Sequence, residues 1–441
     1  MNHVGTFTCE ICEGDIDCRI GFSNRKTQPL SFPCPHCDAL IEITLFLNDS
    51  PSFKLNGVIN DPEKRYGMFD GRNPFIDLHL DFPVWSTTYV PGHTPYLMAI
   101  QKMRKDPQEG ARESDYLHFQ QRLNHLNELH EKSKDLKRTL RLYYGENKKL
   151  FVKKAEEFTE EKLERTLAME DINLALYRLI STTFLPFIDP ISTANFTSEI
   201  SDLVVDIGTK NKQAFDDFMD EIISTNFLAN LQRDCLEIYP RILNAEIALR
   251  PALFMDFVEE QPDNRISGKI STKDFNEYKD LYKDITEIIG KQLSLVAAIN
   301  NIIHRQNHNK FKPKDGGALS SISKFADKTL SEKFKYLDDC WFKFDDAALN
   351  TGARNAIAHY ATEYDEKTQI IQYFSEKEGL KQEKPQEMFF LEFMRMLLIA
   401  FREMHYLHHV IKSLFYYEFI INKNSRKISS NSKDEKRKHK Q

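Results

Sequence analysis

The spacing of apolar residues changes once along the chain, near residue 96. Before that point, apolar and polar residues alternate in short stretches, which is the period of half-buried strands. The alternation predicts strands at residues 6–8, 15–20 and 41–45. Residues 50–97 contain many Pro, Gly and aromatic residues, and this composition predicts loops and short strands.

From about Tyr96 onward, the apolar period is that of amphipathic helices. Leucines between residues 117 and 140 form one stripe, and charged residues occupy the other faces. We expect a mainly α protein, in which a small β module precedes a helical body. Breaks are expected at Pro186, Pro190, Pro262 and Pro313. Further helical segments are predicted near residues 160–185, 197–207, 211–229, 231–257, 272–309 and 386–420.

The composition is that of a globular protein, with 41% hydrophobic and 29% charged residues. No apolar run approaches the roughly 20 residues that span a bilayer. The first residues contain neither a basic segment nor an apolar stretch, so nothing indicates secretion. We therefore expect a soluble, cytoplasmic protein that does not act at a membrane.

Five of the seven cysteines lie within the first 37 residues. Cys9 and Cys12 form one Cys-x-x-Cys pair, and Cys34 and Cys37 form a second. Two such pairs supply four thiolates for a tetrahedral zinc site, and strands around them are typical of a zinc ribbon. Because four thiolates leave no open position for water, the zinc is expected to be structural and to perform no chemistry.

Two neighbouring residues are alternative ligands. Cys18 lies between the pairs and His36 lies inside the second one, but neither has the paired spacing, so both are left out of the predicted site. The sequence does not decide whether the ribbon contacts nucleic acid or protein.

Near the C-terminus, Arg354 and Asn355 are followed by three small or apolar residues and then by His359. A short helical turn is expected to expose Arg354 and His359 on one side. A β-hairpin is predicted directly after it, with strands at 361–364 and 369–374. The alternative is that both residues are purely structural, so that Arg354 caps a helix end and His359 is a buried, hydrogen-bonded histidine.

Other basic pairs have similar spacings. Arg112 precedes His118, and Arg402 precedes His408 and His409, but the first pair begins in a charged turn and the second lies on an apolar helix. His304 and His308 have the spacing of a metal pair on one helical face. They lack an intervening Glu, which favours a polar helix end over a ligand pair.

Arg354, Asn355 and His359 resemble the motif of the HEPN ribonucleases, in which Arg, a polar residue that is commonly Asn, three or more residues and His are carried in a bundle of four or five helices. The resemblance covers about residues 270–420. Together with an N-terminal zinc ribbon, it is similar to the zinc-finger HEPN nucleases of bacterial antiphage defence, especially the ring-activated type.

This resemblance implies a latent endoribonuclease of the abortive infection type. The resemblance implies that a phage protein assembly of several subunits activates it, and that the cleavage of host RNA then stops growth. Arg354, Asn355 and His359 are implied as the catalytic residues. The resemblance also implies a homodimer or higher homo-oligomer in which two motifs face each other.

The chemistry of RNA cleavage fits these residue types. The 2′-hydroxyl of RNA can attack the adjacent phosphorus if a base, an acid and a positive charge are present, and no metal is needed. Imidazoles titrate near neutral pH, and a guanidinium can hold two phosphate oxygens. Because one histidine cannot easily serve as base and acid together, dimerisation is expected to be part of catalysis.

The predicted organisation has five parts. Residues 1–50 are the zinc ribbon, 51–97 an irregular extension, 98–269 a helical linker or sensor region, 270–420 the HEPN-like domain, and 421–441 a basic disordered tail. That tail holds eight Lys and Arg residues against Asp434 and Glu435, whereas the whole chain has a net charge of -6. Contact with nucleic acid and simple solubilisation are both open for it.

Two other functions remain open at this point. One is a non-enzymatic interaction protein, in which the ribbon binds nucleic acid or protein and a HEPN-like bundle serves for dimerisation. The other is a HEPN-type partner of a nucleotidyltransferase. The sequence contains no nucleotide-binding Gly-rich loop of its own.

Overall fold

The computed structural model describes residues 1–60, 64, 69–84, 88–103, 113–159, 162, 168–258, 269–271, 275–314, 317, 319–374 and 385–422. The chain folds as two compact units, each built from three separate segments. Unit 1 contains residues 1–131, 242–283 and 347–399, and unit 2 contains residues 132–241, 284–346 and 400–441. Of the expected basic tail, all but residues 421 and 422 lie outside the described residues.

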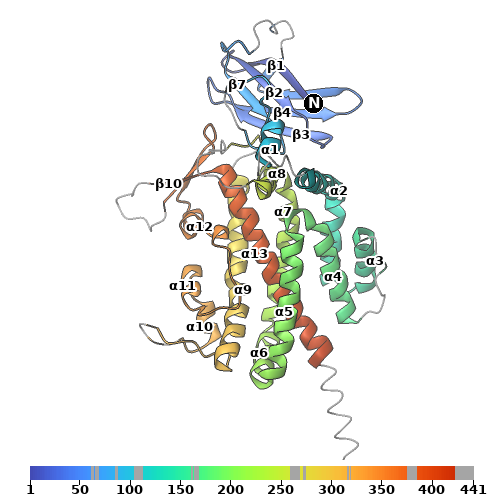
Figure 1. Cartoon of the computed structure of the whole chain (residues 1–441), viewed down its shortest axis with the longest axis vertical. Coiled ribbons are helices and arrows are strands. Elements are labelled where there is room, and N and C mark those ends of the chain that lie inside the picture. Colours follow the sequence, from blue (N-terminus) through green and yellow to red (C-terminus); the bar gives the residue numbers. More distant parts are fainter. Residues whose placement is uncertain are drawn as a thin grey trace, which may run out of the picture. The chain divides into compact units, whose positions relative to one another are not determined.

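The N-terminal part of unit 1 consists of two small sheets (Figure 1). The predicted strands around residues 6–8, 15–20 and 41–45 are confirmed as parts of β1, β2 and β4. The described residues of the segment 51–97 contribute three further strands, β5, β6 and β7, which extend both sheets. The first sheet has the order β6 (Val58–Asn60), β1 (Asn2–Cys9), β2 (Asp15–Gly21) and β7 (Phe75–Leu78), and the second has the order β3 (Thr27–Pro33), β4 (Leu40–Leu47) and β5 (Pro51–Asn56).

The two sheets share one apolar core. Alternate residues of β4, namely Ile41, Ile43 and Leu45, are fully buried, as the period of a half-buried strand requires. Their cluster includes Phe7 of β1 and Ile16 of β2. All strand pairs in these sheets are antiparallel except β2 and β7, which are parallel.

The rest of unit 1 is formed by helices and a third sheet. The predicted hairpin after residue 360 is confirmed, and a strand at 386–389 adds to it in the order β10-β9-β8. Residues 386–389 were expected to begin a helix, so that boundary is wrong. These elements are α1 (Pro95–Met103), α8 (Glu246–Phe254), η3 (Met255–Phe257), η4 (Phe275–Glu277), α12 (Thr351–Ala358), β8 (Thr362–Asp365), β9 (Ile370–Tyr373) and β10 (Gln386–Phe389).

Four helices contribute residues to both units: α2 (Glu113–Tyr144), α7 (Phe227–Asn244), α9 (Lys279–Arg305) and α13 (Phe390–Tyr416). Unit 2 is otherwise helical. Its further elements are α3 (Lys148–Thr159), α4 (Met169–Thr183), η2 (Leu185–Phe187), α5 (Pro190–Lys210), α6 (Lys212–Ser224), α10 (Ile322–Ala326), α11 (Leu330–Lys335) and the π-helix η6 (Tyr417–Asn422); η5 (Asp346–Ala348) lies at the boundary.

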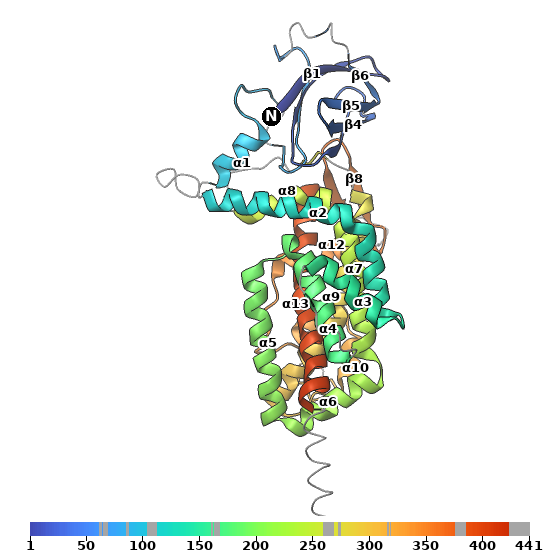
Figure 2. The same ribbon diagram turned by 90° about the vertical axis from the view of Figure 1, so that its right-hand side faces the viewer.

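Within unit 2, the C-terminal part of α13 packs among α4, α5 and α9 (Figures 1 and 2). The Nε2 amide of Gln292 in α9 donates a hydrogen bond to the carbonyl oxygen of Met404 in α13 at 3.0 Å. The Tyr177 ring of α4 contacts the imidazole of His408, with ring centroids 5.1 Å apart. The expected class is therefore confirmed as mainly α, with small N-terminal sheets and a C-terminal helical region.

The expected helix breaks have different outcomes. Pro186 lies in η2, and Pro190 is the first residue of α5, where a missing N–H has no helical partner to lose. Pro313 follows the end of α9. Pro262 lies outside the described residues. Among those residues, no helix is both long and apolar enough to cross a bilayer.

A buried ion network joins distant segments of unit 1. The guanidinium of Arg250 in α8 is fully buried and donates to the carboxylates of Glu246 and Asp81, the latter at 2.8 Å. Arg25 donates to the other oxygen of Glu246 at 2.8 Å. A further donor of Arg250 meets Asn127 Oδ1 in α2 at 2.6 Å. Burying these charges is favourable only while every member has its partner.

We expect Arg250→Ala to destabilise the protein by about 3 kcal/mol, because the buried carboxylate of Asp81 loses its ion-pair partner. Urea unfolding followed by circular dichroism measures the change. Arg72→Ala is the matched control. The Arg72–Asp70 ion pair is exposed to solvent and should contribute little to the free energy of unfolding. Equal midpoints for the Arg250 variant and the wild type would show that the network does not stabilise unit 1.

Candidate functional site

The structure brings the sulfur atoms of Cys9, Cys12, Cys34 and Cys37 together within 4.8 Å of one another. The Cys9–Cys37 and Cys12–Cys34 sulfur pairs are each separated by 3.8 Å. A tetrahedral metal with bonds of about 2.3 Å to sulfur requires sulfur atoms about 3.8 Å apart, whereas a disulfide requires about 2.05 Å. The four thiols therefore have the geometry of a metal site.

Both cysteine pairs lie in turns of the same local form. Cys9 ends β1, and its carbonyl oxygen accepts a hydrogen bond from the N–H of Glu13 at 3.0 Å. Cys34 follows β3, and its carbonyl oxygen accepts from the N–H of Asp38 at 2.9 Å. Glu13 and Asp38 have φ angles of 57° and 63°. Each turn reverses the chain tightly enough to present its two thiols to one point.

The surroundings of two of the thiols shift their pKa values in opposite directions. Burial raises the pKa of the Cys9 thiol, but the backbone N–H groups of Cys12 and Ile11 outweigh it and lower this pKa to about 7. Burial raises the pKa of Cys34 to about 12, so this sulfur needs a cation beside it to be a thiolate at pH 7. A metal ion would supply that charge.

The two alternative ligands have other surroundings. Cys18 is fully buried in the core of the sheets, where burial raises the pKa of its thiol. The Nε2 atom of His36 lies 3.0 Å from the carbonyl oxygen of Asp15. Neither belongs to the group of close metal-binding atoms.

Arg354 and Asn355 lie in α12, an eight-residue helix fixed at its N-terminus by side chains from other elements. The N-cap residue Asn350 accepts a hydrogen bond from the N–H of Ala353 at 2.9 Å. Its side-chain amide donates to the Tyr373 hydroxyl of β9 at 2.8 Å, and its N–H donates to the Tyr282 hydroxyl of α9 at 3.1 Å. These contacts fix the position of the helix.

The motif residues surround the exposed edge of α12. Because each helical residue turns by about 100°, the face opposite the buried residues contains Asn355, and Arg354 and His359 flank it about 140° apart. Asn355 and His359 are exposed, and Arg354 is half-buried. Arg354 and His359 were expected to be exposed on one side of the helix, and they lie at the two borders of a wide exposed edge. The buried residues of α12 are Ala353, Ala356 and Ile357.

Asn355 contacts both of its motif partners. Nη1 of Arg354 donates a hydrogen bond to Oδ1 of Asn355 at 3.1 Å. The backbone N–H of His359, the C-cap residue, donates to the carbonyl oxygen of Asn355 at 3.0 Å. The guanidinium and the amide are therefore in contact, and the residue that carries the imidazole is exposed at the C-terminal end of the same helix. These groups could bind an anion and transfer a proton.

The competing Arg–His pairs are placed differently. Nε of Arg402 donates to the carbonyl oxygen of Phe187 at 2.7 Å, and His408 and His409 are buried. Burial lowers the pKa of His408 to about 3, so its imidazole is neutral at pH 7. Arg112 lies outside the described residues. The expectation of core packing for Arg402 and its neighbours agrees with this burial.

His304 and His308 do not share a helical face. His304 is in the last turn of α9, whereas His308 lies beyond its end. Nε2 of His308 is 2.7 Å from Oε2 of Glu221, and Nε2 of His304 is 3.2 Å from the carbonyl oxygen of Asp339. The two imidazoles have separate partners and form no metal pair.

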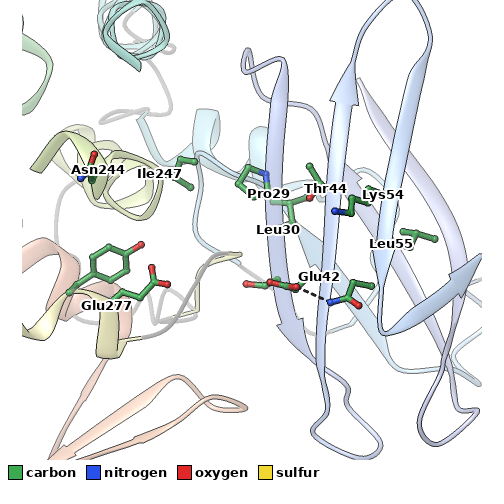
Figure 3. Close-up of a pocket in the computed structure, with 12 residues that line it drawn as sticks. Pro29, Leu30, Glu42, Thr44, Lys54, Leu55, Asn244, Ile247 and Glu277 are labelled. Atoms are coloured by element: carbon green, nitrogen blue, oxygen red, sulfur yellow. Dashed lines mark hydrogen bonds between the residues drawn. The ribbon is translucent and has the colours of Figure 1, made fainter. Parts of the chain in front are cut away.

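Unit 1 also contains a pocket of 520 Å³ that sequence reasoning did not predict (Figure 3). Its lining includes the outward-facing Glu42, Thr44 and Lys54 of the second sheet, opposite Glu277 and residues of α7 and α8. The dashed line in Figure 3 is the hydrogen bond from the Asn56 amide to Glu42, at 2.9 Å. Strand alternation could have identified this polar face, but only the fold reveals the opposing wall.

Searches against protein-family models, curated proteins and solved structures find no match to this chain.

Proposed function

We propose that the protein is a latent, metal-independent endoribonuclease that acts as a dimer and uses Arg354, Asn355 and His359. The observation that supports this most is the accessible arrangement at the end of α12. There the Arg354 guanidinium is hydrogen-bonded to the exposed Asn355, and His359 is exposed at the C-cap of the same helix. A buried structural pair would lack this accessibility.

In the proposed reaction, the 2′-oxygen of RNA attacks the adjacent phosphorus. The imidazole of His359 in one protomer removes the 2′-hydroxyl proton, and His359 of the second copy donates a proton to the departing 5′-oxygen. The 2′-oxygen–phosphorus bond forms as the phosphorus–5′-oxygen bond breaks. Arg354 stabilises the added negative charge on the phosphorane, and Asn355 orients the guanidinium.

A second copy is required because each chain supplies one motif histidine. Asn355 and His359 are exposed on the surface of a single chain, which leaves them accessible to another α12. Two motifs related by a twofold axis would supply both imidazoles and two guanidinium groups at one phosphate.

For the N-terminal module, we infer a structural zinc ion held by Cys9, Cys12, Cys34 and Cys37. In this proposal, the module recognises a phage protein assembly in the bacterial cytoplasm, and the activated dimer then cuts host RNA. The step from recognition to cutting has a contact to support it. Nζ of Lys367 is 3.0 Å from Oδ1 of Asp38, the residue after Cys37.

Lys367 lies in the turn between β8 and β9, and the Tyr373 hydroxyl of β9 accepts the hydrogen bond from Asn350 that fixes α12. A shift of the second cysteine turn would therefore reach the start of the motif helix through the hairpin. Lys367 and Asp38 are both about half exposed, so their ion pair adds little stability and can break at little cost.

The test is to map RNA ends in bacteria that express the protein and are challenged with a panel of phages. Attack by the 2′-hydroxyl leaves 2′,3′-cyclic phosphates and 5′-hydroxyls, whereas metal-activated water leaves a phosphate and a 3′-hydroxyl. We expect cyclic phosphate ends with the wild type and only background ends with His359→Ala.

Equal amounts of cyclic phosphate RNA ends in the two strains would show that His359 does not take part in cleavage. A different result would favour a non-enzymatic interaction protein. In that case, the purified oligomer binds RNA, but none of the phage-challenged strains contains new RNA ends.

A further inference from the structure

Tyr360, the residue after His359, has a side chain that the fold does not use. It is 89% exposed, whereas the other exposed aromatic side chains in the described part of the chain, those of Tyr96, Tyr144 and Phe389, are 36–40% exposed. A large apolar ring left in water contributes nothing to the core. Its presence at this position is therefore not explained by packing.

The backbone of Tyr360 makes the choice of tyrosine more informative. Its φ angle is 57°, in the left-handed region that glycine adopts without strain and bulky residues rarely adopt. The position ends α12 in a Schellman arrangement, where glycine is the usual residue. A tyrosine here is therefore less favourable for folding than glycine, and such local conflicts with folding are expected at functional sites.

The conformation also holds the residue in place. The N–H of Tyr360 donates to the carbonyl oxygen of Ile357 at 3.3 Å. The N–H of Ala361 donates to the carbonyl oxygen of Ala356 at 2.8 Å. On the other side, the N–H of Phe374 in the hairpin region donates to the carbonyl oxygen of Ala361 at 3.2 Å. The ring is thus carried by a backbone that is fixed before any ligand binds.

The other tyrosines near the motif have structural roles. Tyr373 is buried, and its hydroxyl accepts a hydrogen bond from Asn350. The ring of Tyr364 lies 5.8 Å from that of Phe390 and 6.0 Å from that of Phe275. The structure thus separates Tyr360 from the two tyrosines that pack.

We propose that Tyr360 stacks on an unpaired RNA base beside the bond that is cut, so that the substrate is single-stranded RNA. This rests on the proposed function, because the ring lies one residue from the imidazole that would act on the 2′-hydroxyl. A ring can stack on any base, but the base must be free of its pairing partner and neighbours. Duplex RNA offers no such base.

The test measures RNA affinity in the His359→Ala background, which keeps the probe intact. The probes are fluorescent single strands of uridine or adenosine, about 12 nucleotides long, and a duplex of the same length. Tyr360→Phe keeps the ring, Tyr360→Ala removes it, and Tyr360→Gly removes it while relieving the backbone.

We expect Tyr360→Phe to bind single strands as its parent does. Tyr360→Ala and Tyr360→Gly should both lose about 5- to 150-fold in affinity, with little change for the duplex. Because the Gly variant should be at least as stable as its parent, a thermal melt separates loss of stacking from misfolding. Unchanged affinity in both ring-deletion variants would overturn the proposal.

Two further outcomes separate this inference from its rivals. If ring deletion changes the sedimentation of the protein but not its RNA affinity, Tyr360 contacts a second copy and the proposal is wrong. If RNA ends are unchanged by His359→Ala in cells but single-strand binding still depends on the ring, the nuclease function fails and Tyr360 remains an RNA-binding residue.

Discussion

A Cys34→Ser variant is expected to lose the proposed zinc ion and the folded state of the two N-terminal sheets. Cys34 is fully buried and directly follows β3, so its sulfur connects the second sheet to the cysteine cluster. Binding of a structural zinc contributes about 10–16 kcal/mol, which matches or exceeds the roughly 5–15 kcal/mol that stabilises a whole domain. Limited proteolysis within residues 1–60 and elemental analysis of bound zinc measure the effect.

Two other cysteines provide controls for the loss of metal. Cys18→Ala removes a buried thiol from the same module but outside the cluster, and Cys340→Ser removes a half-buried thiol from unit 2. Both should retain one zinc per chain. A zinc-selective chelator should reproduce the protease sensitivity of Cys34→Ser in the wild type. Full zinc content in Cys34→Ser, or sheets that resist protease without metal, would contradict a structural tetrathiolate site.

The second large effect concerns His359. His359→Ala should lower the rate of RNA cleavage by about 10⁴-fold, because each imidazole is proposed to transfer a proton in the dimer. The measured quantity is the rate at which new 5′-hydroxyl RNA ends accumulate in phage-challenged cells containing equal amounts of each variant. Arg354→Lys should lose a smaller part of the rate, because a lysine keeps the charge but cannot hold two phosphate oxygens.

His304→Ala is the matched control, since His304 also lies at a helix end but contacts the carbonyl oxygen of Asp339. It should cleave RNA at the wild-type rate. Co-expression of wild type with His359→Ala tests the dimer separately. If both imidazoles are required, activity should follow the square of the wild-type fraction. A linear decline would mean that one chain carries the whole site.

Local patterns allowed several elements to be predicted from the sequence. The spacing of Cys9, Cys12, Cys34 and Cys37 depends only on turns that each pair forms by itself. The hairpin after residue 360 is likewise local, since both of its strands and the turn lie within a few residues. Most helices kept the period of their apolar stripes, with boundaries that shifted by several residues.

Non-local contacts explain what could not be predicted. The parallel pairing of β7 with β2 joins residues more than fifty positions apart, and β10 forms because β9 offers its edge. The Glu246–Arg250 spacing is recognisable in the sequence, but its partners Arg25 and Asp81 come from distant segments. Tertiary pairing therefore overrode the local preference at residues 386–389.

The sequence could predict which residues form the candidate site but not how they are arranged in space. The sequence pointed to Arg354, Asn355 and His359, whereas their spread around the edge of α12 follows from which residues the rest of unit 1 buries. The left-handed conformation of Tyr360 had no sequence signal, because glycine is the residue that normally marks such a position.

The make-up of unit 1 bears on how the protein is synthesised. Its three segments end at residues 131, 283 and 399, so the last piece leaves the ribosome long after the cysteine pairs have emerged. Nascent chains that stop short of the third segment hold neither α12 nor its hairpin. A chain with the proposed nuclease activity would thus acquire its motif only late in translation, when the partner segments that fix it are already present.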